Sequence, residues 1–205
     1  MRNTFLKELP KALWRARLPI LWMGLTYAVG VISGAVMVHA HSNFALSYRD
    51  HLVGRAQASD PSAIALNRGF PVRAAFLDCA GNLRGAVPST MMGLALVMPF
   101  PWAAFRGWIG GIVSVDGEHN SRLRHGREGL YYIGVLILQL IPYSLAGGTG
   151  VRLGLAYLFP KGRWGYPGSK RWIGLPSEGL RDVGRIYALI VPLFLFASLV
   201  EFLAA

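Results

Sequence analysis

The sequence predicts an all-α fold: a polytopic transmembrane helical bundle with about five membrane segments and additional interfacial amphipathic helices. Hydrophobic residues make up 53% of the 205 positions and charged residues only 15%, whereas soluble domains carry about 25% charged residues. The apolar residues are gathered into blocks, several of which are long enough to cross a bilayer. Basic residues, which give a net charge of +11, flank these blocks, as is usual beside membrane spans. Together these features predict a single membrane domain, residues 1–205.

This composition also excludes several classes of protein. Disordered chains, nucleic-acid-binding domains and most soluble enzymes carry less apolar sequence, so we expect no nucleic-acid partner despite the basic charge. The single cysteine, Cys79, excludes an internal disulfide framework and a cysteine-built metal site. Basic residues beside membrane spans instead indicate contact with anionic lipids.

The N-terminal segment, residues 1–17, is basic and amphipathic. Apolar residues such as Leu9 and Leu13 share one face of a helix, whereas Lys7 and Lys11 lie roughly opposite. This pattern is typical of a helix in the membrane interface, and a charged retention signal before the first span is the alternative. In both cases we expect the segment in the cytoplasm.

The first expected span, residues 18–38, carries no charge. As a helix it would be about 31 Å long, enough to cross the hydrocarbon core. Because no small-residue cleavage site follows, we expect the segment to be retained. Gly30 and Gly34 lie one helical turn apart, a spacing that allows another helix to approach closely.

A polar interval, residues 39–84, follows the first span and is expected outside the cell. Val72, Phe76 and Leu83 recur at helical spacing, so the sequence predicts an amphipathic helix over 71–83. We expect this helix to lie on the membrane surface or against the bundle.

The second expected span, residues 85–105, is interrupted by prolines. Pro88, Pro99 and Pro101 would kink it, which membranes tolerate when neighbouring helices satisfy the freed carbonyl groups. The third apolar segment, residues 106–118, is too short to cross alone. It is therefore either a short crossing or a re-entrant segment.

The last two expected spans are residues 130–149 and 186–203. The interval between them, 159–185, is strongly basic and, like residues 1–17, favours the cytoplasm. An even number of crossings must then separate the two basic segments, so 106–118 is expected to cross. A re-entrant 106–118 would instead place 159–185 outside.

Several short motifs follow one another along nearly the whole chain. They are the basic start Arg2-Asn3-Thr4-Phe5-Leu6, then Asn82-Leu83-Arg84, Phe105-Arg106-Gly107-Trp108-Ile109-Gly110, His125-Gly126 with Glu128, Gly150-Val151-Arg152-Leu153-Gly154, and the apolar run from Pro192 to Glu201. In this order they resemble the stage II sporulation protein M family of bacterial and archaeal integral membrane proteins. The chain departs from the family pattern at Arg106, where the family has asparagine, and at Arg124, where it has proline.

The resemblance implies a non-enzymatic scaffold or accessory subunit of the prokaryotic cytoplasmic (inner) membrane. Its partners would be other membrane proteins, in a hetero-complex or a homo-oligomer. One alternative is a transporter or channel subunit whose third segment lines a pore, and another is a lipid-handling membrane protein. A water-filled cavity beside Arg106 would favour transport, whereas apolar helix faces without a cavity would favour the subunit.

No motif for catalysis or cofactor binding is present. The sequence contains no Gly-x-Ser-x-Gly, Walker, His-Glu-x-x-His or Cys-x-x-Cys motif, so we expect no catalytic residue and no cofactor. Five histidines are present, but their spacing does not bring three or four zinc ligands together. We therefore expect no metal site.

The candidate functional residues are small or charged residues beside or within the spans. Three glycine pairs are expected at helix packing or partner contacts: Gly30 and Gly34, Gly107 and Gly111, and Gly150 and Gly154. Three charged residues are candidates for lipid contact or an internal ion pair, because charge at membrane depth is costly: Arg106, Arg152 and Glu201. For Arg106, the expected internal partners are Asp116, Glu118 and Glu128.

Overall fold

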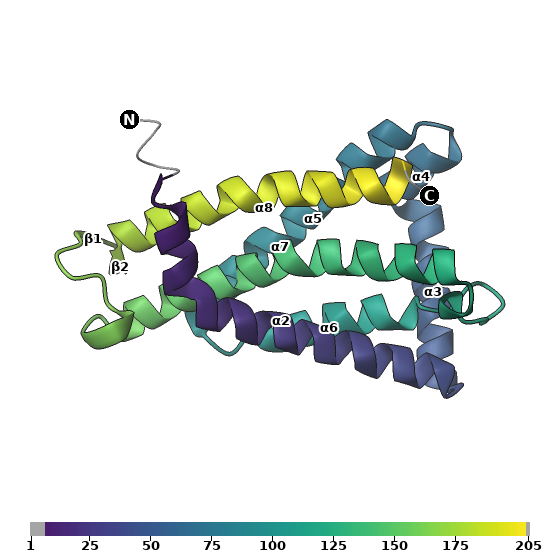
Figure 1. Ribbon diagram of the computed structural model, residues 1–205, viewed down its shortest axis with the longest axis horizontal. Coiled ribbons are helices and arrows are strands. Elements are labelled where there is room, and N and C mark those ends of the chain that lie inside the picture. Colours follow the sequence, from purple (N-terminus) through teal and green to yellow (C-terminus); the bar gives the residue numbers. More distant parts are fainter. Residues whose placement is uncertain (1–6, 204–205) are drawn as a thin grey trace.

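The computed structural model describes residues 7–203 and confirms the all-α class. Over this range the chain forms seven α-helices, three short 3₁₀ helices and one two-stranded hairpin. Residues 1–6, which contain the basic start of the chain, lie outside the described range. The longer helices run along the length of the molecule, and the shorter elements gather at its two ends (Figure 1).

Three helices are long and apolar enough to cross a membrane. They are α2 (Leu9–His39), α7 (Gly126–Leu158) and α8 (Ser177–Leu203), with 31, 33 and 27 residues. At 1.5 Å per residue, even the shortest is about 40 Å long, more than the hydrocarbon core of a bilayer requires. These helices identify the chain as a membrane protein.

The first helix differs from the predicted division at residue 17. The sequence predicts an interfacial helix over 1–17 and a separate span over 18–38, but residues 9–39 form the single helix α2. Pro19 lies inside this helix, and Figure 1 shows the first turns of α2 at an angle to the remainder. A proline within a helix removes a hydrogen bond and kinks it without ending it, which explains the continuity.

The predicted second span, 85–105, is wrong. Its first part belongs to α5 (Pro71–Met92), which also contains the amphipathic segment 71–83, and its last part belongs to α6 (Pro99–Ile112). Between them the chain reverses through η1 (Gly93–Ala95) and Leu96, whose φ of 56° leaves the helical path. Pro99 therefore begins a new helix, whereas Pro88 lies inside α5, and α6 replaces the expected segment 106–118.

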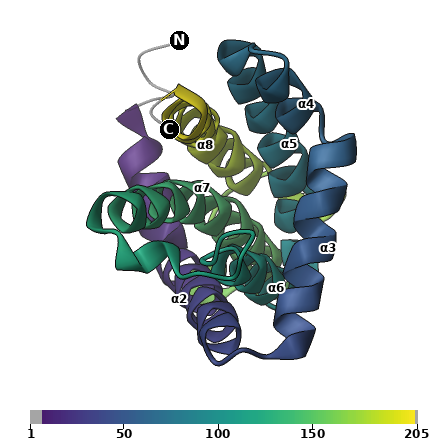
Figure 2. The same ribbon diagram turned by 90° about the vertical axis from the view of Figure 1, so that its right-hand side faces the viewer.

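Two polar helices connect α2 to α5 at one end of the molecule. Helix α3 (Asn43–Ser59) crosses this end from α2 towards the short helix α4 (Pro61–Asn67), as Figure 2 shows. The Asp60 carboxylate caps α4 by accepting a 2.7 Å hydrogen bond from the Ser62 amide, and Pro61 occupies the first helical position.

The long helices alternate in direction. Helices α2, α6 and α8 run one way, and α5 and α7 run the other, so the described start of the chain lies at the same end as the loop before α8 (Figure 1). This loop contains η3 (Gly162–Trp164) and the hairpin of β1 (Arg171–Trp172) and β2 (Leu175–Pro176). The opposite end carries α3, α4, η2 (Arg122–Arg124) and the end of α8.

The core lies where α2, α7 and α8 meet. Ile186, Ile190 and Phe194 of α8 are fully buried, and the Phe194 ring packs edge-on against Tyr143 of α7 with 4.8 Å between centroids. Tyr27 of α2 stacks on the other side of this cluster, 6.4 Å from Tyr143. Tyr143 thus marks the centre of the bundle.

Candidate functional site

A large cavity lies between α6, α7 and the end of α8. It has a volume of about 860 Å³. Its lining extends along α7 from Glu128 near the loop to Tyr143 at the bundle centre, about 22 Å of helix axis. Apolar side chains such as Ile109 and Leu136 form much of its wall, and charged and hydroxyl groups lie among them.

Arg106 of α6 lies in the wall of this cavity. Its guanidinium carbon is 4.0 Å from the centroid of the Tyr143 ring, a cation–π geometry. The guanidinium also lies against Gly85 of α5, where a Cβ atom would collide with Nη1. The absence of a side chain at Gly85 therefore leaves room for the arginine to reach the centre of the bundle.

The expected ion pair of Arg106 with a carboxylate of the following loop does not form. In the described part of the chain, no carboxylate lies within ion-pair distance of Arg106. Asp116 instead accepts hydrogen bonds of 2.9 Å from the backbone amides of Asn120 and Glu118, which hold the pKa of that carboxyl below its ordinary value. Glu128 lies 4.0 Å from His125. Asp116 and Glu128 line the same cavity as Arg106, but neither lies within ion-pair distance of it.

A chain of hydrogen bonds extends from the cavity into α5 and α8. The Tyr143 hydroxyl donates to Asn82 Oδ1 at 2.7 Å, and Asn82 Nδ2 donates to Asp78 Oδ2 at 2.8 Å. Ser198 of α8 donates to the same carboxylate oxygen at 2.7 Å. This network connects α7, α5 and α8 through polar groups inside the bundle.

Glu201 lies on another wall of the cavity. Gln139 Nε2 donates to Glu201 Oε2 at 2.6 Å, and the Tyr131 hydroxyl donates to the Glu201 carbonyl oxygen at 2.6 Å. Glu201 therefore lies against α7. The structure brings Glu201 and Arg106 to the same cavity without pairing them.

Four polar residues of this region are not among the candidates predicted from the sequence, namely Asp78, Asn82, Gln139 and Tyr143. Gln139 is the only amide side chain of the apolar run 133–142, which is a usable signal. Asp78 and Asn82 share one helix face, but both lie in the segment expected on the membrane surface or against the bundle. Their burial became visible only when α5 proved to be part of the bundle.

Four of the six candidate glycines lie between α2 and α6. A Cβ atom at Gly30 or Gly34 would collide with the carbonyl oxygen of Ala104 or Trp108, and one at Gly107 or Gly111 with the backbone of α2. The two helices therefore contact each other backbone to backbone. We call this contact, formed by these four glycines, the glycine seam.

The third glycine pair packs against the turn between α5 and α6. A Cβ atom at Gly150 would collide with the Thr90 backbone, and one at Gly154 with the Gly93 carbonyl oxygen. All six candidate glycines are therefore used at contacts within this chain.

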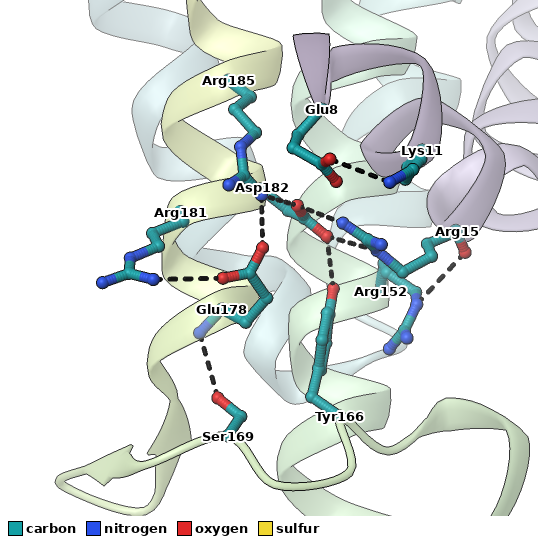
Figure 3. A network of polar contacts seen from close by, with 10 residues as sticks. All are labelled: Glu8, Lys11, Arg15, Arg152, Tyr166, Ser169, Glu178, Arg181, Asp182 and Arg185. Atoms are coloured by element: carbon teal, nitrogen blue, oxygen red, sulfur yellow. Dashed lines mark hydrogen bonds and ion pairs between the residues drawn. The ribbon is translucent and has the colours of Figure 1, made fainter. Parts of the chain in front are cut away.

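Arg152, near the end of α7, is buried. It is 4% exposed, donates from Nε to the Arg15 carbonyl oxygen at 3.1 Å and donates from Nη1 to the Trp164 carbonyl oxygen at 2.6 Å. Its guanidinium also lies over the Tyr166 ring, 4.6 Å from the centroid. These contacts join α2, α7 and the loop before α8 (Figure 3).

Asp182 is the acidic centre of the same region. Its carboxylate accepts from Arg15 Nε and Nη2 at 2.7 and 2.6 Å, from Arg185 at 2.7 Å and from the Tyr166 hydroxyl at 2.9 Å (Figure 3). Burial raises the pKa of Tyr166 to about 12, so the phenol keeps the proton that it donates. Arg185 additionally pairs with Glu178 at 2.5 Å. We call this group, with Arg152, the Asp182 cluster.

Among residues 7–203, no three histidine, cysteine, aspartate or glutamate side chains gather where they could hold a metal ion. Comparison of the chain with protein-family models, curated proteins and solved structures finds no match. The resemblance to the stage II sporulation protein M family thus rests on the sequence motifs alone.

Proposed function

We propose that this chain is a multi-pass membrane protein that binds a small or amphipathic molecule with an anionic group in the cavity beside Arg106, as a transporter or channel subunit does. The observation that carries the proposal is the cavity of about 860 Å³ in which Arg106 has no carboxylate partner. A cavity beside this residue is the feature that distinguishes transport from a purely structural subunit.

The charge of Arg106 supports an anionic ligand. An arginine does not lose its proton in proteins, so at membrane depth it needs an anion, a hydrogen-bond acceptor or water. The Tyr143 ring offsets only part of this requirement. An anionic ligand group beside Arg106 would supply the missing partner.

The remaining walls indicate the rest of the ligand. Ile109 and Leu136 offer apolar surface, whereas Gln139 and Glu201, which share a hydrogen bond, offer polar groups. A molecule with an anionic end and an apolar body fits this arrangement, and lipid-like molecules belong to that class. A soluble anion without apolar surface would leave the wall of the cavity uncovered.

The proposal includes a topology of five membrane segments. Helices α5 and α6 would cross together with α2, α7 and α8, and the 14 residues of α6, about 21 Å, make it the short crossing. The basic residues at the start of α2 and in the loop before α8 favour the cytoplasm for that end. The cavity would then open towards the external side, and the family resemblance would place the protein in a prokaryotic inner membrane.

A scaffold or accessory subunit is the alternative that the resemblance implies. The sequence places the glycine pairs at helix packing or partner contacts, and in the structure all six glycines are used at contacts within the chain. They therefore provide no surface for a partner. Stable co-purification with another membrane protein, together with no binding in the cavity, would favour this alternative.

Ligand binding in nanodiscs tests the proposal. Dodecanoate and dodecyl phosphate serve as anionic probes and dodecanol as the uncharged analogue, with the fluorescence of Trp102 in the cavity wall contributing to the readout. We expect saturable binding of at least one anionic probe and at least tenfold weaker binding by Arg106→Gln. Arg127→Gln, which removes an exposed arginine outside the cavity, is the matched control and should bind like the parent.

Two outcomes would overturn the proposal. Equal binding of the anionic probes by the parent and Arg106→Gln would show that the arginine does not recognise them. Equal binding of dodecanol would show that the cavity selects only apolar bulk.

The topology has its own test. After replacement of Cys79, single cysteines are introduced at Ala58 and at Lys161, both exposed in the structure. An impermeant thiol reagent applied to intact cells should label position 58 and not position 161. Labelling at 161 but not at 58 would reverse the orientation.

A further inference from the structure

A second, smaller cavity lies at the end of the bundle that carries the loop before α8. It has a volume of about 270 Å³ and is formed by the start of α2, the end of α7 and the loop before α8. Four arginines line it, together with two tryptophans and a leucine: Arg15, Arg17, Arg152, Arg163, Trp14, Trp164 and Leu18. None of the lining residues is acidic.

The four arginines differ in their hydrogen-bond and ion-pair partners. Arg15 pairs with Asp182, and the two nitrogens of Arg152 that form hydrogen bonds donate to uncharged carbonyl oxygens. Arg17 and Arg163 are exposed and lie over tryptophan rings, with guanidinium carbons 3.6 Å from the Trp14 centroid and 4.4 Å from the Trp164 centroid. Asp182 therefore compensates one arginine of the four, and the cavity carries excess positive charge.

An exposed apolar surface begins at the edge of this cavity. Trp14 and Leu18 line the cavity and are 66% and 40% exposed. Leu21, Trp22 and Leu25 continue the exposed surface along α2 at helical spacing, into the part of the helix that is apolar enough to cross a membrane. A ligand in the cavity would thus have its charged part among arginines and hydrophobic chains beside α2.

We propose that this cavity binds the headgroup of an anionic phospholipid, whose acyl chains lie along the exposed face of α2. Guanidinium groups bind phosphate oxygens through paired N–H donors, which ammonium groups cannot match. Tryptophans prefer the membrane interface, which is the depth of a lipid headgroup. The inference is independent of the ligand in the cavity beside Arg106, because it concerns different residues at the other end of the molecule.

The expected orientation of the chain agrees with this ligand. The end that carries the small cavity is the basic end, for which the distribution of lysine and arginine favours the cytoplasm. Anionic phospholipids give the cytoplasmic leaflet its negative surface potential. A lipid bound here would bridge α2 and the loop before α8 and would lie beside Arg15 and Arg152 of the Asp182 cluster, which Figure 3 draws.

Lipid binding to the purified protein in mild detergent tests the proposal. The probes are phosphatidylglycerol, phosphatidylcholine as the zwitterionic lipid and inorganic phosphate as the free anion, with binding measured by native mass spectrometry and by thermal stabilisation. The test variant is Arg17→Gln with Arg163→Gln, since both side chains are exposed and neither pairs with a carboxylate of the described chain. The control is Lys161→Gln with Lys170→Gln, which removes the same charge from the same loop region outside the cavity.

We expect the parent and the lysine control to bind phosphatidylglycerol equally and to prefer it to phosphatidylcholine. The arginine variant should bind it at least tenfold more weakly, because it loses guanidinium hydrogen bonds to the phosphate, each worth about a factor of ten. Equal binding by the arginine variant, or the same loss in the lysine control, would overturn the site. Saturation by inorganic phosphate without lipid preference would show a free-anion site and overturn the lipid assignment.

Discussion

Arg152 and Arg106 occupy similar surroundings in two regions of the bundle and have different numbers of partners. Both guanidinium groups lie over a tyrosine ring, at 4.6 and 4.0 Å from the centroid. Arg152 also donates to two carbonyl oxygens. It belongs to the Asp182 cluster, in which the buried carboxylate of Asp182 accepts from several donors. Arg106 has no carboxylate partner among the described residues and faces a cavity of about 860 Å³.

The different numbers of partners indicate different roles: the charges of the Asp182 cluster stabilise the fold, whereas the charge of Arg106 is available to a ligand. A buried ionic group whose hydrogen bonds are satisfied holds neighbouring elements in place, and removing one partner leaves the others uncompensated. A cation without an internal anion contributes little to folding and remains free to bind one. The comparison therefore predicts large losses of stability at Asp182 and small losses at Arg106.

Asp182→Asn should cause the largest loss of stability. The substitution removes the negative charge that Arg15 and Arg185 share, and Asp182 is only 3% exposed. Breaking a buried pair costs about 3–5 kcal/mol. The melting temperature in detergent measures the loss.

Arg181→Gln, which breaks an exposed pair with Glu178, is the control and should change stability by no more than about 1 kcal/mol. Equal effects of the two substitutions would contradict the structural role of the Asp182 cluster.

The glycine seam should show the next largest effect. Gly34→Leu or Gly111→Leu places a side chain where the facing backbone lies, so α2 and α6 must separate. Overpacking of this kind costs about 1–3 kcal/mol. The loss should appear in the isolated chain, as a lower melting temperature of the monomer.

Gly81→Leu is the matched control for the seam, since no atom lies within contact distance of a Cβ at that position. Leucine is a better helix former than glycine, so this variant should be as stable as the parent or slightly more stable. A parent-like melting temperature for Gly34→Leu and Gly111→Leu would show that the seam is not a close contact.

The apolar helices were the most predictable part of the fold. The uncharged block 18–38 and the runs before Gly148 and Leu203 predicted parts of α2, α7 and α8, because span length and lack of charge are local properties. The turn at residues 93–98 was not predictable in the same way. Three prolines fit either a kinked helix or a new one, and the choice depends on the contact of Gly93 with Gly150 of α7.

The candidate site was predictable only in part. Arg106 was found because a permanent cation beside apolar segments is unusual. Its surroundings depend on which helices lie beside α6, so Tyr143 and Gly85 could not be assigned to it from spacing along the chain. Arg152 shows the same limit: its position at the end of a span suggested a surface residue, whereas the fold of the loop after α7 covers it.

Arg106→Ala should have a smaller effect on stability than Asp182→Asn or the substitutions in the glycine seam. The substitution removes one cation–π contact, worth about 0.5–1 kcal/mol at a partly exposed site, and leaves no carboxylate unpaired. Arg106→Lys should retain part of this contact. The melting temperatures of both variants, measured without added ligand, check this expectation. A loss from Arg106→Ala as large as that from Asp182→Asn would remove the distinction between the two regions.

The smallest effect is expected at Asp50, whose carboxylate is exposed, whereas that of Asp182 is buried. Arg49 donates to Asp50 Oδ1 at 2.9 Å and, with His119, holds the pKa of that carboxyl below its ordinary value. Because the folded pKa is the lower one, the stabilisation is present above the ordinary value of about 3.9 and is lost as the pH falls through the folded value. Asp50→Asn should therefore destabilise the protein at pH 6 by at most about 1 kcal/mol, seen as a slightly lower melting temperature, and by less at pH 3. The same difference at both pH values would mean that the charge of Asp50 does not hold α3 to the loop that carries His119.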